Sequence, residues 1–271
     1  MKIFQEPAEL QQWARGRKRE GKGIALVPTM GYLHEGHLSL IERAKQEGAD
    51  EIIVSVFVNP VQFCPGEDYD KYPRDEQADL EKCTAAGATA IFFPTPANMY
   101  LDRHSIYVTE EDLSKTLCGA RRPGHFRGVC TVVAKLFNLA HPDFAVFGQK
   151  DYQQAQIIKR MVRDLNFDLR IIVAPIVREE SGLARSSRNT YLSAGEKEMA
   201  LAISASLRAL KAGEIKFAEI APRLAAAGLK VDYVEAVDAE TLEPRADAEP
   251  GCCVLVAAFC GKTRLIDNIV L

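Results

Sequence analysis

Two histidines and two glycines stand close together at the junction of a predicted strand and a predicted helix. The apolar run 23–27 is typical of a buried parallel strand, and the apolar residues of 38–44 recur at helical spacing. Open α/β sheets bind ligands at such junctions, where unpaired N–H groups at a helix N-terminus favour an anion. Histidines there can add hydrogen bonds or positive charge to a developing oxyanion. The segment between strand and helix therefore predicts a site for the phosphates of a nucleotide, built on Gly31, His34, Gly36 and His37.

Two histidines near a helix start can equally be an N-cap and a packed ring, or an adventitious metal pair. The two glycines favour the phosphate site, because glycine lets the backbone approach a phosphate closely. The run His34-Glu35-Gly36-His37 resembles the HxGH signature of nucleotidylyltransferases and class I aminoacyl-tRNA synthetases. The chain has no Walker A motif, which disfavours a P-loop ATPase.

Polar residues also follow the second predicted strand and open a later helix. Asn59 and Gln62 leave that strand at its carboxyl end, where their amides can bind the carboxylate, hydroxyl or amine of a small substrate. A purely structural Asn-Pro turn is the alternative. The run 121–129 combines arginines, glycines and His125, which indicates either a capped helix start with solvated arginines or recognition of substrate and phosphate.

Two more segments suit a phosphate. The turn after the fourth strand places Gly148, Lys150 and Asp151 before a helix, and Lys150 would supply a point charge there. Asp151 can instead be an ordinary N-cap. In 180–189, two hydroxyls and two guanidiniums lie in what we expect to be a flexible loop, which could close over a triphosphate or simply be solvated.

The elements that must position these residues alternate between strand and helix over the first two-thirds of the chain. Nearly continuous apolar strands separated by helices predict an α/β fold, a doubly wound parallel sheet with right-handed crossovers. The predicted strands are 23–29, 51–58, 88–94, 144–147 and 169–174, and the predicted helices are 37–48, 74–87, 125–141 and 151–165.

The pattern changes after Pro175, where 176–192 has no clear period and is predicted to be a hinge and a functional loop. We therefore expect a Rossmann-like domain over 1–175 and a smaller C-terminal α+β domain over 176–271. The predicted elements of the second domain are helices at 194–212 and 217–227, and strands at 231–238, 253–259 and 263–271.

The composition excludes some classes of protein. With 34 Lys+Arg against 37 Asp+Glu, the chain lacks the basic excess of a general nucleic-acid binder. No apolar run approaches the roughly 18 residues of a membrane span, and no signal peptide is visible, so we expect a cytoplasmic protein. The seven scattered cysteines include no Cys-x-x-Cys pair and are expected to be reduced, buried, small apolar residues.

Taken together and in order, these segments resemble the pantothenate synthetase (pantoate–β-alanine ligase) family, and the resemblance covers essentially the whole chain. It implies an HxGH-type Rossmann enzyme, usually a homodimer, that condenses D-pantoate with β-alanine. ATP would be cleaved to AMP and diphosphate through a pantoyl adenylate. The resemblance implies an ATP site along Met30, Gly31, Tyr32, Leu33, His34, Glu35, Gly36 and His37, completed by Gly148, Gln149, Lys150, Asp151, Val177, Arg185, Ser186, Ser187 and Arg188.

The same resemblance implies roles for single residues. Gln62 and Gln154 would hold pantoate, Gln62 would also lie near β-alanine, and His37 corresponds to the residue assigned as proton donor. Mg²⁺ is expected to be coordinated mainly by the phosphates, with no protein ligand assigned. Arg185 departs from the family, which usually has Met at that position. The groups expected to stabilise the charge on the phosphates are His34, His37, Lys150, Ser186, Ser187 and Arg188.

Two other functions stay open on the same scaffold: a nucleotidylyltransferase, which would release the nucleotide-coupled compound, and a catalytically silent nucleotide-binding regulator. The substrate segments around Asn59, Gln62, His125 and Gln154 disfavour the first, and the charged groups facing the phosphates disfavour the second. A tRNA-aminoacylating enzyme is disfavoured because the chain has no anticodon-binding extension and no basic bias.

Overall fold

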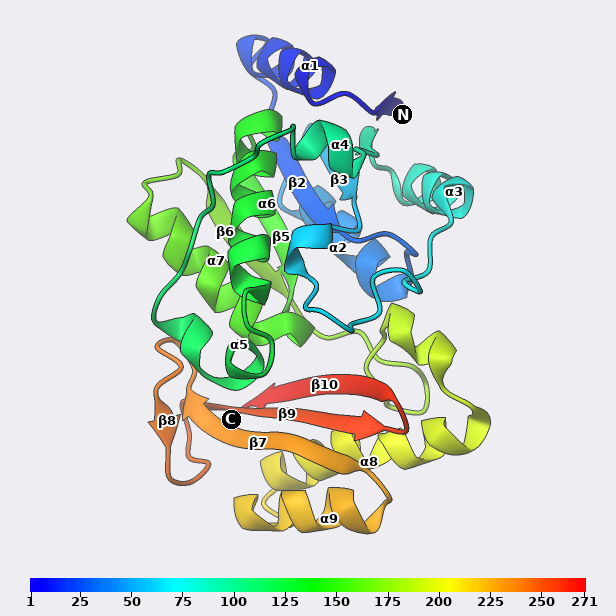
Figure 1. Cartoon of the computed structure of the whole chain (residues 1–271), viewed down its shortest axis with the longest axis vertical. Coiled ribbons are helices and arrows are strands. Elements are labelled where there is room, and N and C mark those ends of the chain that lie inside the picture. Colours follow the sequence, from blue (N-terminus) through cyan, green and yellow to red (C-terminus); the bar gives the residue numbers. More distant parts are fainter. The chain divides into compact units, whose positions relative to one another are not determined.

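Apolar and β-branched segments form the six strands of a parallel sheet, which confirms the predicted fold class (Figure 1). The structure, a computed structural model, describes residues 1–271. Five of the strands were predicted, with bounds that differ by one or two residues, whereas the edge strand β1 is too short to carry a readable pattern. The strands are β1 (Lys2–Phe4), β2 (Ile24–Thr29), β3 (Glu51–Val56), β4 (Ala90–Phe92), β5 (Phe144–Gly148) and β6 (Arg170–Ala174).

The sheet changes its direction of growth at β2. The strand order is β1-β4-β3-β2-β5-β6, so the chain adds β3 and β4 on one side of β2 and later adds β5 and β6 on the other. Such a switch point is where open α/β sheets bind ligands, at the carboxyl ends of the strands. Residues 30–37 directly follow β2, so the fold places the glycine–histidine motif at this switch point.

Helices cover both faces of the sheet. Val27 and Val54 share a core cluster with Ile41 of α2 and Cys83 of α3. The alternate residues of β2 are equally buried outside that cluster, on the face where α6 and α1 pack. The helices of this part of the chain are α1 (Pro7–Arg19), α2 (Glu35–Gln46), α3 (Glu76–Ala86), α4 (Pro96–Met99), α5 (Leu117–Arg121), α6 (His125–Ala140) and α7 (Tyr152–Asp164).

The C-terminal residues form an antiparallel sheet of order β10-β9-β7-β8. Its core is made by Ile203 and Leu207 of α8, Leu224 of α9, and Val254 and Val256 of β9. The predicted α+β architecture is confirmed, with the short strand β8 added. The elements are α8 (Ala194–Lys211), α9 (Ile220–Ala226), β7 (Lys230–Asp238), β8 (Pro244–Arg245), β9 (Cys252–Cys260) and β10 (Thr263–Val270).

The chain divides into two compact units. The first contains residues 1–148 and 157–174, and the second contains 149–156 and 175–271. Residues 149–156 therefore group with the second unit, although the sequence analysis included them in the first domain. A division into two independently folding domains stays a prediction.

No helix of the structure has the length and apolar character needed to cross a membrane. All seven cysteines are free thiols, and five are buried as expected. Cys64 and Cys118 are partly exposed.

Helix α6 lies unusually close to η1 (Pro60–Gln62), the turn that follows β3. A Cβ atom on Gly128 of α6 would lie 2.5 Å from the carbonyl oxygen of Val61 and 2.6 Å from the backbone nitrogen of Gln62. Only glycine therefore lets the backbone of this helix touch the backbone of Gln62.

We expect Gly128→Ala to lower the free energy of unfolding by about 1–3 kcal/mol, because η1 or α6 must shift. Gly16→Ala in α1 is the matched control, since a Cβ there meets nothing within 4 Å. It should raise the free energy of unfolding by about 0.5–1 kcal/mol. Urea unfolding of the three proteins measures both effects. Equal stability of Gly128→Ala and the parent would contradict the close contact.

Candidate functional site

The turn after β2 is held in an uncommon backbone conformation. Gly31 and Tyr32 both have positive φ, 84° and 51°. A Cβ on Gly31 would lie 2.7 Å from the Cγ1 of Val56 and 3.0 Å from a carboxylate oxygen of Asp79. Glycine at position 31 is thus required by conformation and by space.

Asp79 of α3, which belongs to none of the motifs read from the sequence, fixes this turn. Its two carboxylate oxygens accept the N–H groups of Tyr32 (2.8 Å) and Leu33 (2.6 Å). Lys82, one helical turn further, donates to the carbonyl of Leu33 at 2.7 Å. Burial raises the pKa of Asp79, and the two amide hydrogen bonds oppose this shift only in part. The one sequence signal was a carboxylate on the buried side of a helix, four residues before Cys83.

His34 and His37 form a reciprocal cap at the start of α2. The Nδ1 of His34 accepts the N–H of Gly36 at 3.1 Å, and the Nδ1 of His37 accepts the N–H of His34 at 3.3 Å. The two rings stack with centroids 4.0 Å apart. A ring nitrogen that accepts a hydrogen bond carries no hydrogen, so both rings are neutral and carry their hydrogen on Nε2. The capping alternative is therefore real, and in this arrangement the N–H of each ring is at Nε2.

Asn59 uses its whole hydrogen-bonding capacity inside the protein. Its Oδ1 accepts from Tyr100 at 2.7 Å and from the N–H of Val61 at 3.3 Å, while its Nδ2 donates to Gln62 and to the carbonyl of Gly128, both at 3.1 Å. Burial raises the pKa of Tyr100, which keeps that hydroxyl a donor. Asn59 is fully buried and has no capacity left for a substrate, so its geometry suits positioning Gln62 rather than binding a ligand.

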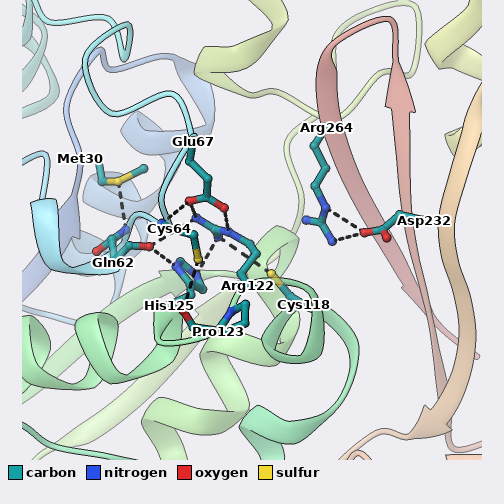
Figure 2. Close-up of polar contacts among 10 residues, drawn as sticks. All are labelled: Met30, Gln62, Cys64, Glu67, Cys118, Arg122, Pro123, His125, Asp232 and Arg264. Atoms are coloured by element: carbon teal, nitrogen blue, oxygen red, sulfur yellow. Dashed lines mark hydrogen bonds and ion pairs between the residues drawn. The ribbon is translucent and has the colours of Figure 1, made fainter.

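The side chain of Gln62 is thereby oriented from two sides. Its Oε1 accepts from Asn59, and its Nε2 lies 3.1 Å from the sulfur of Met30, in the turn after β2 (Figure 2). A weak sulfur acceptor is readily exchanged for a better one, so this amide N–H can be offered to a polar ligand.

In the second unit, Asn268 of β10 holds the turn η3 (Gln149–Asp151). Its Nδ2 donates to the carbonyl of Gln149 at 2.9 Å and to that of Lys150 at 3.1 Å, and its Oδ1 accepts from the side chain of Gln149 at 3.2 Å. Asn268 is buried, and the side chain of Lys150 lies 3.5 Å from Asp151. Asp151 is thus an ionic neighbour of the lysine.

The expected flexible loop is a tied hairpin. Arg178 pairs with Asp267 through two contacts, at 2.6 and 2.9 Å, and donates to the carbonyl of Gly182 at 3.3 Å. Arg178 and Ala184 form an isolated antiparallel bridge. Asp267 is buried on β10, next to Asn268. Adjacent residues of one strand therefore hold both polar segments of this unit.

The serines and arginines of this hairpin are part of its local structure. The hydroxyl of Ser186 caps η4 (Ser187–Tyr191) by accepting the N–H of Arg188 at 3.3 Å. Asn189 donates to the carbonyl of Ala184 and to the carboxylate of Glu179, both at 3.0 Å. Arg185 lies 3.6 Å from that same carboxylate, which offsets the extra charge at this position.

The predicted site residues fall into both units. The first unit contains Met30–His37, Asn59, Gln62 and Gly148, and the second contains Gln149–Asp151, Gln154, Val177 and Arg185–Arg188. Gln154 lies in the first turn of α7 and is half-buried, as is Val177. No group of three or more His, Cys, Asp or Glu side chains could hold a metal ion.

Comparisons with known proteins agree along the whole chain. The family model described as pantoate-beta-alanine ligase matches residues 2–270. The chain is 51% identical to the pantothenate synthetase of Clostridium acetobutylicum over 99% of this chain and 98% of that protein. It is also 51% identical to the pantothenate synthetase of Myxococcus xanthus, over 99% and 96% respectively.

Solved structures give the same result. The pantothenate synthetase of Thermus thermophilus is 42% identical, with a TM-score of 0.90 and 99% of each chain covered. The pantoate-beta-alanine ligase of Francisella tularensis, complexed with β-γ ATP and β-alanine, is 34% identical with a TM-score of 0.87, covering 100% of this chain and 97% of that one.

We expect Asn268→Asp to lower the free energy of unfolding by about 1–3 kcal/mol, because a carboxylate would face two backbone carbonyls that lose their donor. Hydrogen exchange at residues 149–151 should rise together with this loss. Gln12→Glu is the matched control, since it makes the same chemical change at an exposed position of α1. A change no larger at position 268 than at position 12 would refute the anchoring role of Asn268.

Proposed function

Because the chain belongs to the pantoate–β-alanine ligase family, we propose that its reaction runs through a pantoyl adenylate and that the turn after β2 binds the phosphates of ATP. The family's activity is the condensation of pantoate with β-alanine, driven by ATP. What remains to be assigned is the intermediate and the part that each residue plays.

The observation that carries the proposal is the geometry of residues 30–37. This segment lies at the switch point of a parallel sheet and leads into the N-terminus of α2, where an anion is favoured. His34 and His37 carry their ring hydrogen on Nε2, because their Nδ1 atoms accept backbone hydrogen bonds. Donors fixed in this way stabilise charge on phosphate oxygens without reorganising.

The chemistry requires activation of a carboxylate, because oxide is a poor leaving group. A carboxylate oxygen of pantoate attacks the α-phosphorus of ATP, and the bond from that phosphorus to diphosphate breaks. The amine of β-alanine then attacks the acyl carbon, loses a proton and displaces AMP. Two reactants must meet the same carbon in turn, so positioning contributes as much as charge.

We assign stabilisation of the charge on the phosphates to His34, His37, Lys150, Ser186, Ser187 and Arg188. ATP enters as its Mg²⁺ complex, in which the ion is bound mainly by phosphate oxygens. The relative from Francisella tularensis, complexed with β-γ ATP and β-alanine, supports ATP and β-alanine as ligands here.

Gln62 and Gln154 are the residues that we assign to pantoate, with Gln62 also near β-alanine. The support for Gln62 is its amide, which Asn59 orients and which is paired on its N–H side only with the sulfur of Met30. The family resemblance alone supports Gln154, a homodimer and a place in the cytoplasm. Analytical ultracentrifugation tests the homodimer.

We expect the purified protein to exchange labelled diphosphate into ATP when pantoate and Mg²⁺ are present and β-alanine is absent. An adenylate route requires this exchange, because its first step is complete before the amine arrives. Exchange should stop when pantoate is left out. Oxygen label in the carboxylate of pantoate should appear in AMP during the full reaction. Its appearance in diphosphate would overturn the adenylate mechanism, and exchange without pantoate would show that AMP is transferred to an acceptor other than pantoate.

We expect His37→Ala and Lys150→Ala to cut turnover by a hundredfold or more, since loss of one preorganised donor costs on the order of 3 kcal/mol in the transition state. His37→Gln should retain more activity than His37→Ala, because the amide nitrogen can replace the Nε2–H donor. Lys159→Ala, an exposed change on α7, is the control for Lys150. Near-normal turnover of a folded His37→Ala or Lys150→Ala protein would remove that residue from the proposal.

A further inference from the structure

Gln62 is held through its backbone as well as through its side chain. Its carbonyl oxygen lies 2.8 Å from the Nδ1 of His125, the first residue of α6 (Figure 2). The Nε2 of the same ring lies 2.9 Å from the guanidinium of Arg122. Arg122 in turn pairs with Glu67 through two contacts, at 2.6 and 2.8 Å. Gln62, His125, Arg122 and Glu67 thus form a continuous row of hydrogen-bonded residues.

The partners fix the protonation state of His125. A carbonyl oxygen can only accept, so Nδ1 must carry a hydrogen. A guanidinium can only donate, so Nε2 must carry a lone pair. His125 is therefore a neutral ring with its hydrogen on Nδ1, as when a second partner fixes the tautomer of a functional histidine.

Glu67 compensates the charge of the largely buried Arg122, and it links the row back to the segment that contains Gln62. Burial acts to raise the pKa of Glu67, but the hydrogen bonds and charge of Arg122 outweigh it, so that pKa lies below its ordinary value. Burial likewise acts to lower the pKa of Arg122, and Glu67 more than offsets this effect. Glu67 also accepts the N–H of Cys64 at 3.0 Å, which ties the chain two residues beyond Gln62.

This arrangement limits what Arg122 can do within the run 121–129. Arg122 is not a solvated arginine at a helix start, because its side chain is only 16% exposed and is paired with Glu67. It also does not offer a free fork to a phosphate. Its Nη1 contacts His125, and its Nη2 contacts Glu67. The same Nη2 also lies 3.5 Å from the carbonyl oxygen of Gln62.

We propose that Glu67, Arg122 and His125 are positioning residues that set the place of Gln62 for pantoate and β-alanine. The inference rests on the proposed role of Gln62 and adds three residues to it that touch no substrate. The row acts on the backbone of η1, which Gly128 of α6 also approaches closely. Small displacements of a substrate-binding group can cost about a hundredfold in rate, so such support affects the reaction.

The first experiment compares substitutions of His125 in the full-length enzyme. His125→Ala should raise KM for pantoate and lower the corresponding kcat/KM about tenfold or more, with KM for ATP changed less than twofold. His125→Asn should restore most of this loss, because its amide nitrogen takes the place of Nδ1–H. His125→Gln should not, since its amide lies at the Nε2 position. Equal kinetics of Ala, Asn and Gln variants would overturn the proposal.

A double-mutant cycle separates failure of this inference from failure of the proposed function. If His125 acts through Gln62, the double variant Gln62→Ala with His125→Ala should have the kinetics of Gln62→Ala alone. Additive losses would overturn the inference and leave the role of Gln62 intact. Normal KM for pantoate in Gln62→Ala would instead refute the proposed role of Gln62, and the inference with it.

A pH profile gives a readout that packing alone would not move. Acid adds a proton to Nε2 of His125, which then meets the cation of Arg122. Glu67 interacts with both His125 and Arg122, and Cys64 and Cys118 interact with Arg122. The kcat/KM for pantoate should therefore fall as pH is lowered, and His125→Asn should lose the part of this fall that belongs to position 125. An identical acidic limb in both proteins would count against the neutral ring.

Glu67→Gln and its matched control complete the test. Asp232 pairs with Arg264 through contacts of 3.0 and 2.8 Å, so Asp232→Asn makes the same change opposite another half-buried arginine (Figure 2). Glu67→Gln should raise KM for pantoate, whereas Asp232→Asn should leave it unchanged. Melting temperatures show that both proteins are folded. A shared effect, or none at position 67, would argue that Glu67 is no more than a surface ion pair.

Discussion

Backbone N–H and C=O groups that lie outside helices and sheets must still find hydrogen-bond partners when they are buried. The segments that we assign to the substrates depend on how this protein supplies those partners. In each case a side chain distant in sequence supplies the partner. Asp79 accepts the amides of the turn after β2, His125 contacts the carbonyl of Gln62, and Asn268 donates to two carbonyls of η3. The reactive groups are therefore carried on segments whose path is set by residues that need not touch a ligand.

Two arginine–carboxylate pairs also hold polar segments, Arg122 with Glu67 beside His125 and Arg178 with Asp267 in the hairpin. Removing two charges from water costs nearly as much as their attraction returns, so such pairs add little net stability. Two parallel N–H donors facing two oxygens do, however, fix both direction and distance. We interpret these pairs as fixing the geometry of their segments. The apolar cores of the two units offset the free-energy cost of burying the charges.

The sequence predicted the features that depend on local residue patterns, and it missed those that depend on hydrogen bonds between residues far apart in the chain. The apolar strands and the glycine–histidine turn were readable, because period and spacing carry them. Asp79 lies 46 residues from Leu33, and Asn268 lies 119 residues from Gln149, so no local pattern could connect them. The anchoring of the Ser-Arg loop was missed for the same reason, since Asp267 lies 89 residues from Arg178.

The two histidines of the turn after β2 show how the hydrogen bonds that position a side chain limit the chemistry that it can perform. The resemblance to the family implies His37 as a proton donor, yet its Nδ1 accepts the N–H of His34. A protonated ring has no lone pair, so an imidazolium at position 37 would break the cap that places it. A neutral imidazole is far too weak an acid to give up its Nε2 hydrogen, but it is a good hydrogen-bond donor. His37 is thus better suited to donating a hydrogen bond to phosphate oxygens than to transferring a proton.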